Sequence, residues 1–181
     1  MRFNEVIEHE VTVDVTTEPV TLDELKRHLN MLFDTDGSYD FSDDDDYLTS
    51  IIPQARESLE AYTGLSFAPK TIVAVLRNEL GDIEIPYGPI TAVASVKDED
   101  DNNVTCKIVG NQFKKIADPW LPYLKVTYTA GYTSLPNALK RAILEEAAFR
   151  YSHRGEEVDS AGYCKGSLAL AAPFKRTSWL V

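Results

Sequence analysis

The fold is best predicted from residues 42–64, which read SDDDDYLTSIIPQARESLEAYTG. Four acidic residues, Asp43, Asp44, Asp45 and Asp46, follow Ser42 directly. Ser42 is a suitable N-cap, and carboxylates placed directly after a cap complement the positive end of a helix dipole. Apolar side chains then recur with a period of 3.6 residues, and Gly64 is typical of the position just beyond a helix. The sequence therefore predicts a helix over residues 43–63 with one buried face.

Two segments precede this helix. The tetrapeptide Thr21-Leu22-Asp23-Glu24 is a capping box, in which the first and last residues satisfy each other's backbone N–H groups. It predicts a helix over residues 22–32. Residues 1–19 alternate loosely between apolar and polar side chains and end near a proline, so we expect an extended N-terminal arm or an edge strand.

The region after the central helix has a β pattern. Short stretches rich in β-branched residues alternate with turn residues from residue 70 to residue 132. The strands expected here are 71–76, 83–85, 90–96, 104–109, 112–116 and 124–129. We interpret them as a small antiparallel sheet inserted between helices.

A third helix is predicted over residues 136–154, because Pro136 suits a first helical turn and an apolar face follows it. Residues 155–181 begin polar and then become apolar. The predicted fold class is α+β: a bundle of three to four helices with an inserted antiparallel sheet and extended N- and C-terminal arms. We expect an arm at 1–19, one domain at 20–154 and a C-terminal arm at 155–181.

Composition limits the function. The chain has 181 residues, 44% of them hydrophobic, which is enough for one sizeable core. Its 29 acidic and 18 basic side chains give a net charge of -11, which argues against a surface that binds nucleic acid by releasing counterions. Passive passage of DNA along a repelling surface is compatible with this charge. No leader and no membrane span is expected, so we predict a soluble protein that is not exported.

The acidic stretch 34–46 is the candidate for a cation site. Asp34, Asp36, Ser38 and Asp40 alternate like the oxygen ligands of a calcium loop, but Tyr39 stands where such a loop needs glycine. A solvated loop and helix start is the favoured interpretation. A metal-dependent enzyme or cation-binding module that uses Asp34–Asp46 remains the alternative, and a small monomeric binding module is a third possibility.

Other candidates for chemistry are weak. The histidines His9, His28 and His153 lie in no catalytic motif, and Cys106 and Cys164 have no metal-ligand spacing. We therefore predict no enzyme activity, no metal and no cofactor. The aromatic residues Trp120, Tyr123, Tyr128 and Tyr132 are interpreted as core and sheet packing in preference to a stacking platform for nucleic acid.

The C-terminus is apolar where a frayed tail would be polar. Trp179-Leu180-Val181 must dock somewhere, either on the body of the chain itself or on a neighbouring protein.

Taken in order, several motifs resemble the head-tail connector (adaptor) family of tailed bacteriophages. The motifs that carry this resemblance are VTLDELKRHL (20–29), DDYL (45–48), EAYTG (60–64), IPYGPI (85–90), VTYTAGY (126–132), LPNALK (135–140), YSHR (151–154) and the apolar element that ends in Pro-Phe-Lys-Arg (168–176). Each motif alone is generic, and their order and spacing carry the resemblance.

The resemblance implies a non-enzymatic virion protein. Such a subunit forms a ring, typically of twelve copies, beneath the portal, where it extends the DNA channel and links the capsid to a neck, head-completion or tail-terminator protein. Assembly would take place in the host cytoplasm. The acidic helix start Asp43–Asp46 is a candidate surface for partners. The residues expected to bind the portal are Leu168, Leu170, Pro173, Phe174, Lys175, Arg176, Trp179 and Leu180.

Overall fold

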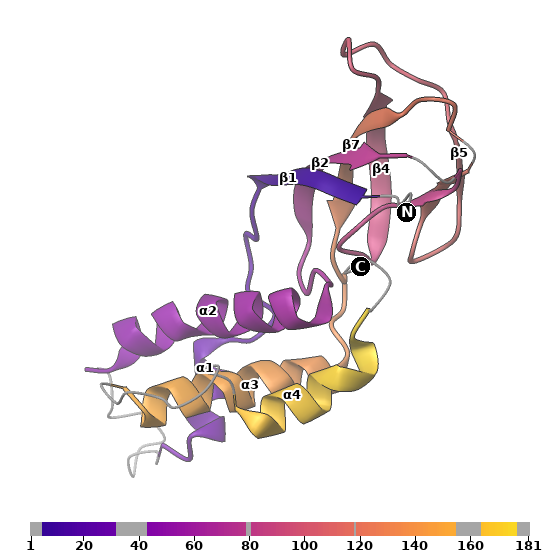
Figure 1. The fold of residues 1–181 in the computed structure, drawn as a ribbon. Helices are drawn as coiled ribbons and strands as arrows, with labels where there is room; N and C mark the ends of the chain where they lie inside the picture. Colours follow the sequence, from indigo (N-terminus) through magenta and orange to yellow (C-terminus); the bar gives the residue numbers. More distant parts are fainter. Residues whose placement is uncertain (1–4, 32–42, 79–80, 118, 155–163, 177–181) are drawn as a thin grey trace. The chain divides into compact units, whose positions relative to one another are not determined.

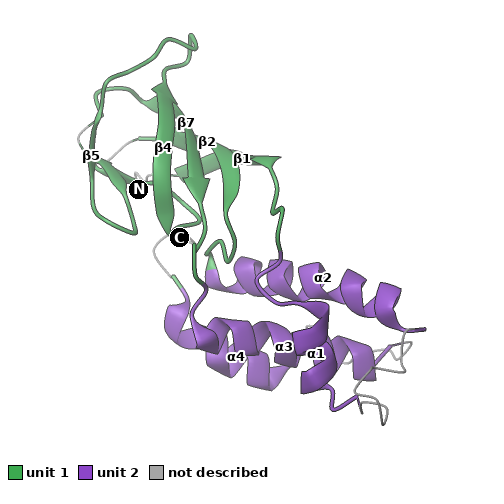
Figure 2. Cartoon of the chain, turned by 180° about the vertical axis from the view of Figure 1, so that it is seen from behind, with its two compact units in different colours: residues 1–17, 64–134, 176–181 green, residues 18–63, 135–175 purple. Residues whose placement is uncertain are grey.

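The computed structural model describes residues 5–31, 43–78, 81–117, 119–154 and 164–176. The chain divides into two compact units (Figures 1 and 2). Unit 1 contains Met1–Thr17, Gly64–Ser134 and Arg176–Val181 and is built from strands; unit 2 contains Glu18–Thr63 and Leu135–Lys175 and is helical. The predicted α+β class, with a β region inserted between helices, is confirmed.

Unit 2 is a bundle of four helices. They are α1 (Leu22–His28), α2 (Asp45–Thr63), α3 (Asn137–Ser152) and α4 (Lys165–Ala171), and a 3-10 turn, η1 (Ala172–Phe174), follows. Helix α3 packs against each of the other three. The three predicted helices are confirmed, although α1 ends at His28 instead of extending to residue 32.

Local signals explain where these helices begin and end. The Thr21 hydroxyl accepts a hydrogen bond from the Glu24 backbone N–H at 3.2 Å, and the Thr21 backbone N–H donates to the Glu24 carboxylate at 2.8 Å. The predicted capping box is therefore confirmed. Helix α2 continues through Pro53 and is followed by Gly64, whose φ of 70° is a left-handed conformation that favours glycine. The expected N-cap Ser42 lies outside the described residues.

The bundle buries the apolar face that the sequence predicts for the helix over residues 43–63. Helix α2 contributes a fully buried face, and α3 places its own apolar residues within the same unit. The buried apolar residues of the two helices are Leu48, Ile51, Ile52, Ala55, Leu59, Leu139, Ala142, Ile143 and Ala147. At about 1.5–3 kcal/mol for each large side chain removed from water, this burial is the main favourable contribution to the stability of the unit.

Unit 1 contains two antiparallel sheets. The larger has the order β1-β2-β7-β4, and the smaller has the order β3-β6-β5. The strand bounds are β1 Glu5–Val13, β2 Lys70–Arg77, β3 Ile83–Glu84, β4 Ile90–Lys97, β5 Lys107–Val109, β6 Lys115–Ala117 and β7 Tyr123–Ala130. All six strands predicted between residues 70 and 132 are present. The single sheet that we expected is in fact two.

Both sheets contribute to one apolar core. Strands β2 and β7 are in register from Lys70 opposite Ala130 to Arg77 opposite Tyr123, so alternate residues of both strands point to the same side. The buried residues of this core are Ile72, Ala74, Leu76, Ile83, Ile85, Ile90, Val96, Ile116, Leu124, Val126, Tyr128 and Ala130. Tyr128 is completely buried, as the core interpretation predicted.

Gly131, just after β7, has a backbone conformation and a close contact that only glycine accommodates. Gly131 has a φ of 120°, and its backbone N–H donates to the Pro89 carbonyl at 2.8 Å. A Cβ atom at this position would lie 2.1 Å from the Ala68 carbonyl oxygen, which is closer than any real contact. Only glycine fits here without movement of the backbone.

The N-terminal segment agrees with its predicted structure, and the C-terminal segment does not. The N-terminal segment forms an edge strand, β1, which pairs with β2. The C-terminal segment, expected to be an extended arm, is helical over Lys165–Phe174. None of the helices within the described residues is both long enough and apolar enough to cross a bilayer.

Candidate interaction site

The acidic start of helix α2 is bound to other helices of unit 2. The Asp44 carboxylate accepts hydrogen bonds from the Tyr151 hydroxyl at 2.5 Å and from the Arg154 guanidinium at 2.8 Å. These two donors, Tyr151 first, hold the pKa of Asp44 below its ordinary value. Asp44 therefore connects the beginning of α2 to the end of α3.

Its neighbour Asp45 pairs with Lys26, whose side chain on α1 is only 5% exposed. Asp43 and Asp46 are exposed. Of the four carboxylates that the sequence groups as one acidic surface, two are thus engaged inside the unit and two face solvent. The upstream part of the acidic stretch, including Asp34, Asp36, Ser38 and Asp40, lies outside the described residues.

The C-terminal segment is partly exposed along its length. Leu168, Leu170 and Phe174 are half-buried, and Pro173 is exposed. Lys175 lies over the Tyr62 ring, with 4.4 Å between its ammonium nitrogen and the ring centroid. Trp179 and Leu180 lie outside the described residues.

Arg176, the last described residue, has partners in unit 1. Its guanidinium pairs with the Glu84 carboxylate and lies 3.7 Å from the centroid of the Phe113 ring. Both contacts favour a charged, well-positioned arginine. Of the predicted portal-binding residues that the structure describes, those up to Lys175 belong to unit 2 and Arg176 belongs to unit 1.

A buried carboxylate that the sequence did not single out holds α4 against α3. Glu146 is fully buried and accepts hydrogen bonds from the Ser167 hydroxyl at 2.7 Å and the Cys164 backbone N–H at 3.0 Å. Its other oxygen pairs with Arg150 at 3.3 Å. Glu146 and Arg150 are four residues apart, a spacing that favours an ion pair on a helix, but nothing local in the sequence indicates that the pair is buried.

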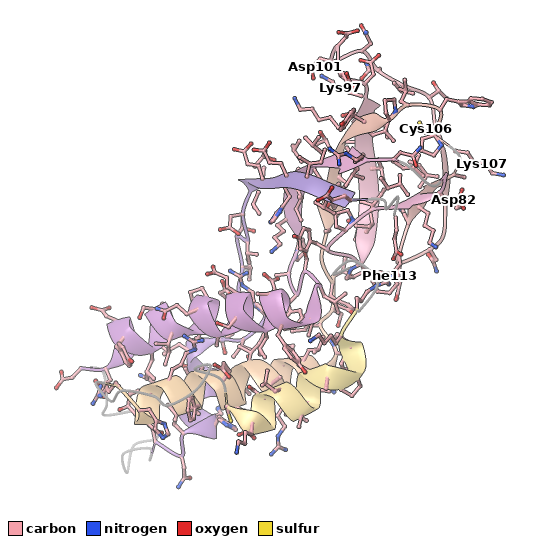
Figure 3. All side chains as sticks on the ribbon, viewed as in Figure 1. Asp82, Lys97, Asp101, Cys106, Lys107 and Phe113 are labelled. Atoms are coloured by element: carbon pink, nitrogen blue, oxygen red, sulfur yellow. The ribbon has the colours of Figure 1, made fainter. Side chains whose placement is uncertain are left out.

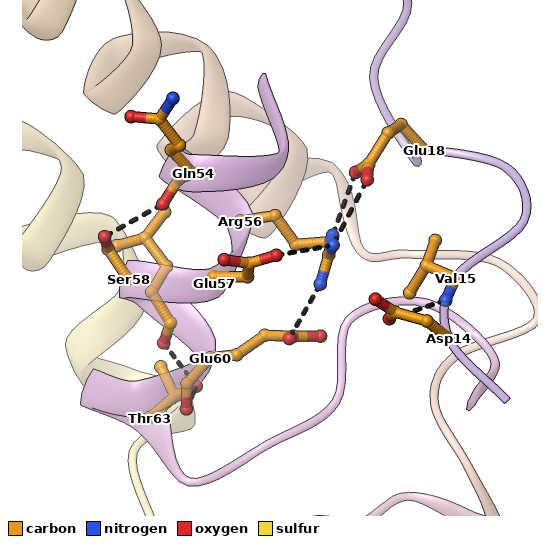
Figure 4. A network of polar contacts seen from close by, with 10 residues as sticks. Asp14, Val15, Glu18, Gln54, Arg56, Glu57, Ser58, Glu60 and Thr63 are labelled. Carbon is orange, nitrogen blue, oxygen red and sulfur yellow. Dashed lines mark hydrogen bonds and ion pairs between the residues drawn. The ribbon is translucent and has the colours of Figure 1, made fainter. Parts of the chain in front are cut away.

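A second internal network surrounds Arg56 (Figure 4). This side chain is 3% exposed and pairs with Glu18 at 2.9 Å and with Glu60 at 3.0 Å, while Glu57 lies at 3.3 Å. Burial opposes the charge on Arg56, but the hydrogen bond to Glu18 and the nearby carboxylates raise the pKa of Arg56 overall. The network fixes the chain at Glu18 against α2.

Trp120 is the most exposed large hydrophobic side chain of the described residues, at 94%. Its loop is held in place. Asn78 donates from its side chain to the Pro119 carbonyl at 2.6 Å and from its backbone to the Pro122 carbonyl at 2.7 Å, and Leu121 packs against the core. The interpretation of Trp120 as a core residue is therefore wrong, because the ordered loop directs it into solvent.

Several of the described charged groups make internal ion pairs. No group of three or more potential metal ligands occurs among the residues with described placement. An open pocket of about 380 Å³ is lined in part by Asp98, Asp101 and Lys125. Its carboxylates already accept from neighbours: Asp98 from the Asn102 backbone N–H at 2.8 Å, and Asp101 from Lys125 at 3.2 Å. These interactions lower the pKa of both aspartates.

Similarity to solved structures supports the observed fold. One match is a chain of the neck of an empty GTA particle with C6 symmetry, with a TM-score of 0.77 and 19% identity. Others are a chain in the virion of a native gene transfer agent particle (TM-score 0.74, 20% identity) and a chain in the neck of a native GTA particle with C12 symmetry (TM-score 0.71, 17% identity). Each match covers 96% of this chain and 98% of the other. No curated protein matches the chain.

The sequence itself matches a family model over residues 19–169, and the description of that family is phage gp6-like head-tail connector protein. The matched range includes α1, α2, α3 and most of α4, and six of the seven described strands. The family is structural, in agreement with a site built from ion pairs and exposed apolar side chains. The chain therefore belongs to the phage gp6-like head-tail connector protein family.

Proposed function

We propose that this protein is a connector subunit that forms a ring of twelve copies beneath the portal, extends the DNA channel and joins the capsid to the neck or tail. The observation that carries the proposal is the family match over residues 19–169. Two of the similar chains belong to necks with C6 and C12 symmetry, which is consistent with a closed ring. The role is structural and not enzymatic, its site of action is the virion, and assembly takes place in the host cytoplasm.

Within this function, the C-terminal segment is the portal-binding element. The half-buried Leu168, Leu170 and Phe174, together with the exposed Pro173, give it apolar surface for a partner. Trp179 and Leu180 add two large apolar side chains. The side of the ring away from the portal receives a neck, head-completion or tail-terminator protein, and double-stranded DNA passes through the ring without sequence recognition.

A pull-down on immobilised portal tests this assignment. Removing residues 168–181 would delete the buried Ala171 and disturb unit 2, so the sharper variant is Trp179→Ala with Leu180→Ala. We expect it to lose at least about tenfold in portal affinity, because large aromatic anchors carry much of an interface's binding energy. The matched control is Trp120→Ala, which removes an exposed tryptophan from unit 1 and should be captured like the wild type.

The outcomes separate the two parts of the proposal. Equal capture of the tail variant and the wild type would show that the C-terminal segment is not the portal-binding element. Wild-type protein that neither binds the portal nor forms rings in its presence, by negative-stain electron microscopy, would overturn the connector function itself.

A further inference from the structure

Unit 1 has two outer faces that point in opposite directions. The four-stranded and three-stranded sheets both turn their inner residues into one shared core. The remaining face of each sheet is therefore directed outward, away from that core and away from the other sheet. Strand β1 is one of the two edge strands of the larger sheet and β5 is one of the two edge strands of the smaller sheet, and the two lie at opposite sides of the unit (Figures 1 and 2).

The face at β1 is acidic. Glu8 lies opposite Val75 and Glu10 lies opposite Val73, whereas the intervening His9 lies opposite the buried Ala74. This alternation places both glutamates on the outer side of the sheet. Both are exposed, and neither has a cationic partner among the residues that the structure places.

The face at β5 and β6 is basic. Lys107 pairs with Ala117 and Lys115 pairs with Val109, while Ile116 between them is buried in the core. Both lysines are exposed and, within the described parts of the chain, lack an acidic partner. Figure 3 shows Lys107 directed away from the body of the unit.

Exposed apolar side chains also lie on β1, where Ile7 is 47% exposed and Val13 is 54% exposed. On β5, Ile108 is 38% exposed, but it lies opposite the buried Ile116 and is therefore on the core side of the sheet, not on the face of the two lysines. No described strand pairs with the outer edge of β1 or of β5. Such edges are sites where a second chain can add through backbone hydrogen bonds.

We propose that, in the ring, the β1 face of one subunit docks on the β5–β6 face of the next subunit. The occupant of each face is a second copy of this chain, because the two faces have opposite charge and point in opposite directions. A head-to-tail contact of this kind, repeated with a closing rotation, generates a ring. Local pairing of Glu8 and Glu10 with Lys107 and Lys115 also opposes the repulsion between chains that each carry a charge of -11.

The inference rests on the proposed ring function and is tested by charge reversal in the full-length chain. One variant carries E8K and E10K, and the other carries K107E and K115E. Sedimentation velocity, alone and with purified portal, measures the assembled fraction, and circular dichroism checks that each variant is folded. We expect each variant to lose at least about tenfold in association, because like charges then meet at every contact.

Mixing the two variants is the decisive measurement. One variant then has two basic faces and the other has two acidic faces, so an alternating ring can form again. We expect the mixture to assemble where neither variant does. The matched control for E8K with E10K is E99K with D100K, which makes the same change in net charge on the loop after β4 and should assemble like the wild type.

The outcomes distinguish this interface from the connector function. If the wild type forms rings and both variants form them equally well, or if the mixture fails to assemble, the proposed contact is overturned while the ring remains. If the wild type forms no ring alone or on the portal, the proposed function fails first.

Discussion

Glu146 places a carboxylate where water cannot reach it. Three donors, from Arg150, Ser167 and the Cys164 backbone, satisfy its two oxygens. Substituting Glu146→Ala removes this acceptor and leaves the Ser167 hydroxyl and the Cys164 N–H without it. We expect the free energy of unfolding to fall by about 2–4 kcal/mol, measured by chemical denaturation.

The adjacent Glu145 is the matched control for this prediction. It is 30% exposed and pairs with Arg141, which is 67% exposed, so Glu145→Ala should cost less than about 1 kcal/mol. Glu146→Gln retains an acceptor and should fall between the two. If Glu146→Ala were as stable as Glu145→Ala, the carboxylate would not be what holds α4 against α3.

Arg56 shows why such residues escape sequence analysis. Its partner Glu60 lies one helical turn away and is visible as a spacing, but Glu18 comes from a segment 38 positions earlier. Burial of this arginine depends on how distant segments pack. The local sequence shows the spacing of Arg56 and Glu60 but not how distant segments pack around them. The same spacing is found in solvent-exposed ion pairs, which stabilise a helix by only tenths of a kcal/mol.

At the level of elements, Asp44 links the beginning of α2 to the end of α3 through Tyr151 and Arg154. Because these donors lower the folded-state pKa of Asp44, its contribution to stability is complete above the ordinary value of 3.8 and is lost as the pH falls through the lower folded-state value. Asp44→Asn removes that contribution. We expect the variant to unfold at a lower temperature than the wild type at pH 7. The difference between the two unfolding temperatures should narrow as the pH falls below about 4.

Thermal unfolding monitored by circular dichroism between neutral and acidic pH measures this gap. Asp43→Asn is the control, since Asp43 is exposed and has no described ion-pair partner. A gap between wild type and Asp44→Asn that stayed constant from pH 7 into strong acid would contradict the assignment of the link to the ionised carboxylate.

Elements with local signals were predicted well, and those that depend on distant pairing were not. The capping box at Thr21 and Glu24 marks the start of α1 because both groups lie within one turn. The division of the strands into two sheets depends on β2 pairing with β7, about fifty residues apart. Helix α4 is short and contains a glycine and three small side chains, so little in its own sequence predicts it. The contact that supports it, between Ser167 and Glu146, depends on α3.

On the scale of the whole molecule, the chain alternates between its two units. It begins in unit 1, enters unit 2 at Glu18, returns at Gly64, leaves again at Leu135 and reaches unit 1 once more at Arg176. Each compact unit is therefore built from segments that are separated along the sequence. The predicted arm, domain and arm are ranges along the chain and stay a prediction beside these two units.

The net charge of -11 is also a property of the whole molecule, and it predicts how a ring of these subunits treats DNA. A wall with an excess of carboxylates has few cations with which to release counterions from phosphate, so duplex DNA should slide past it without adhering. We expect no retardation of a duplex in an electrophoretic mobility assay at about 50 mM salt, where phosphate-binding proteins bind most tightly. A basic DNA-binding protein is the positive control. Tight binding that weakens steeply with added salt would contradict this prediction. It would mean that the lysines and arginines cluster on one DNA-facing surface, so that the channel binds the DNA.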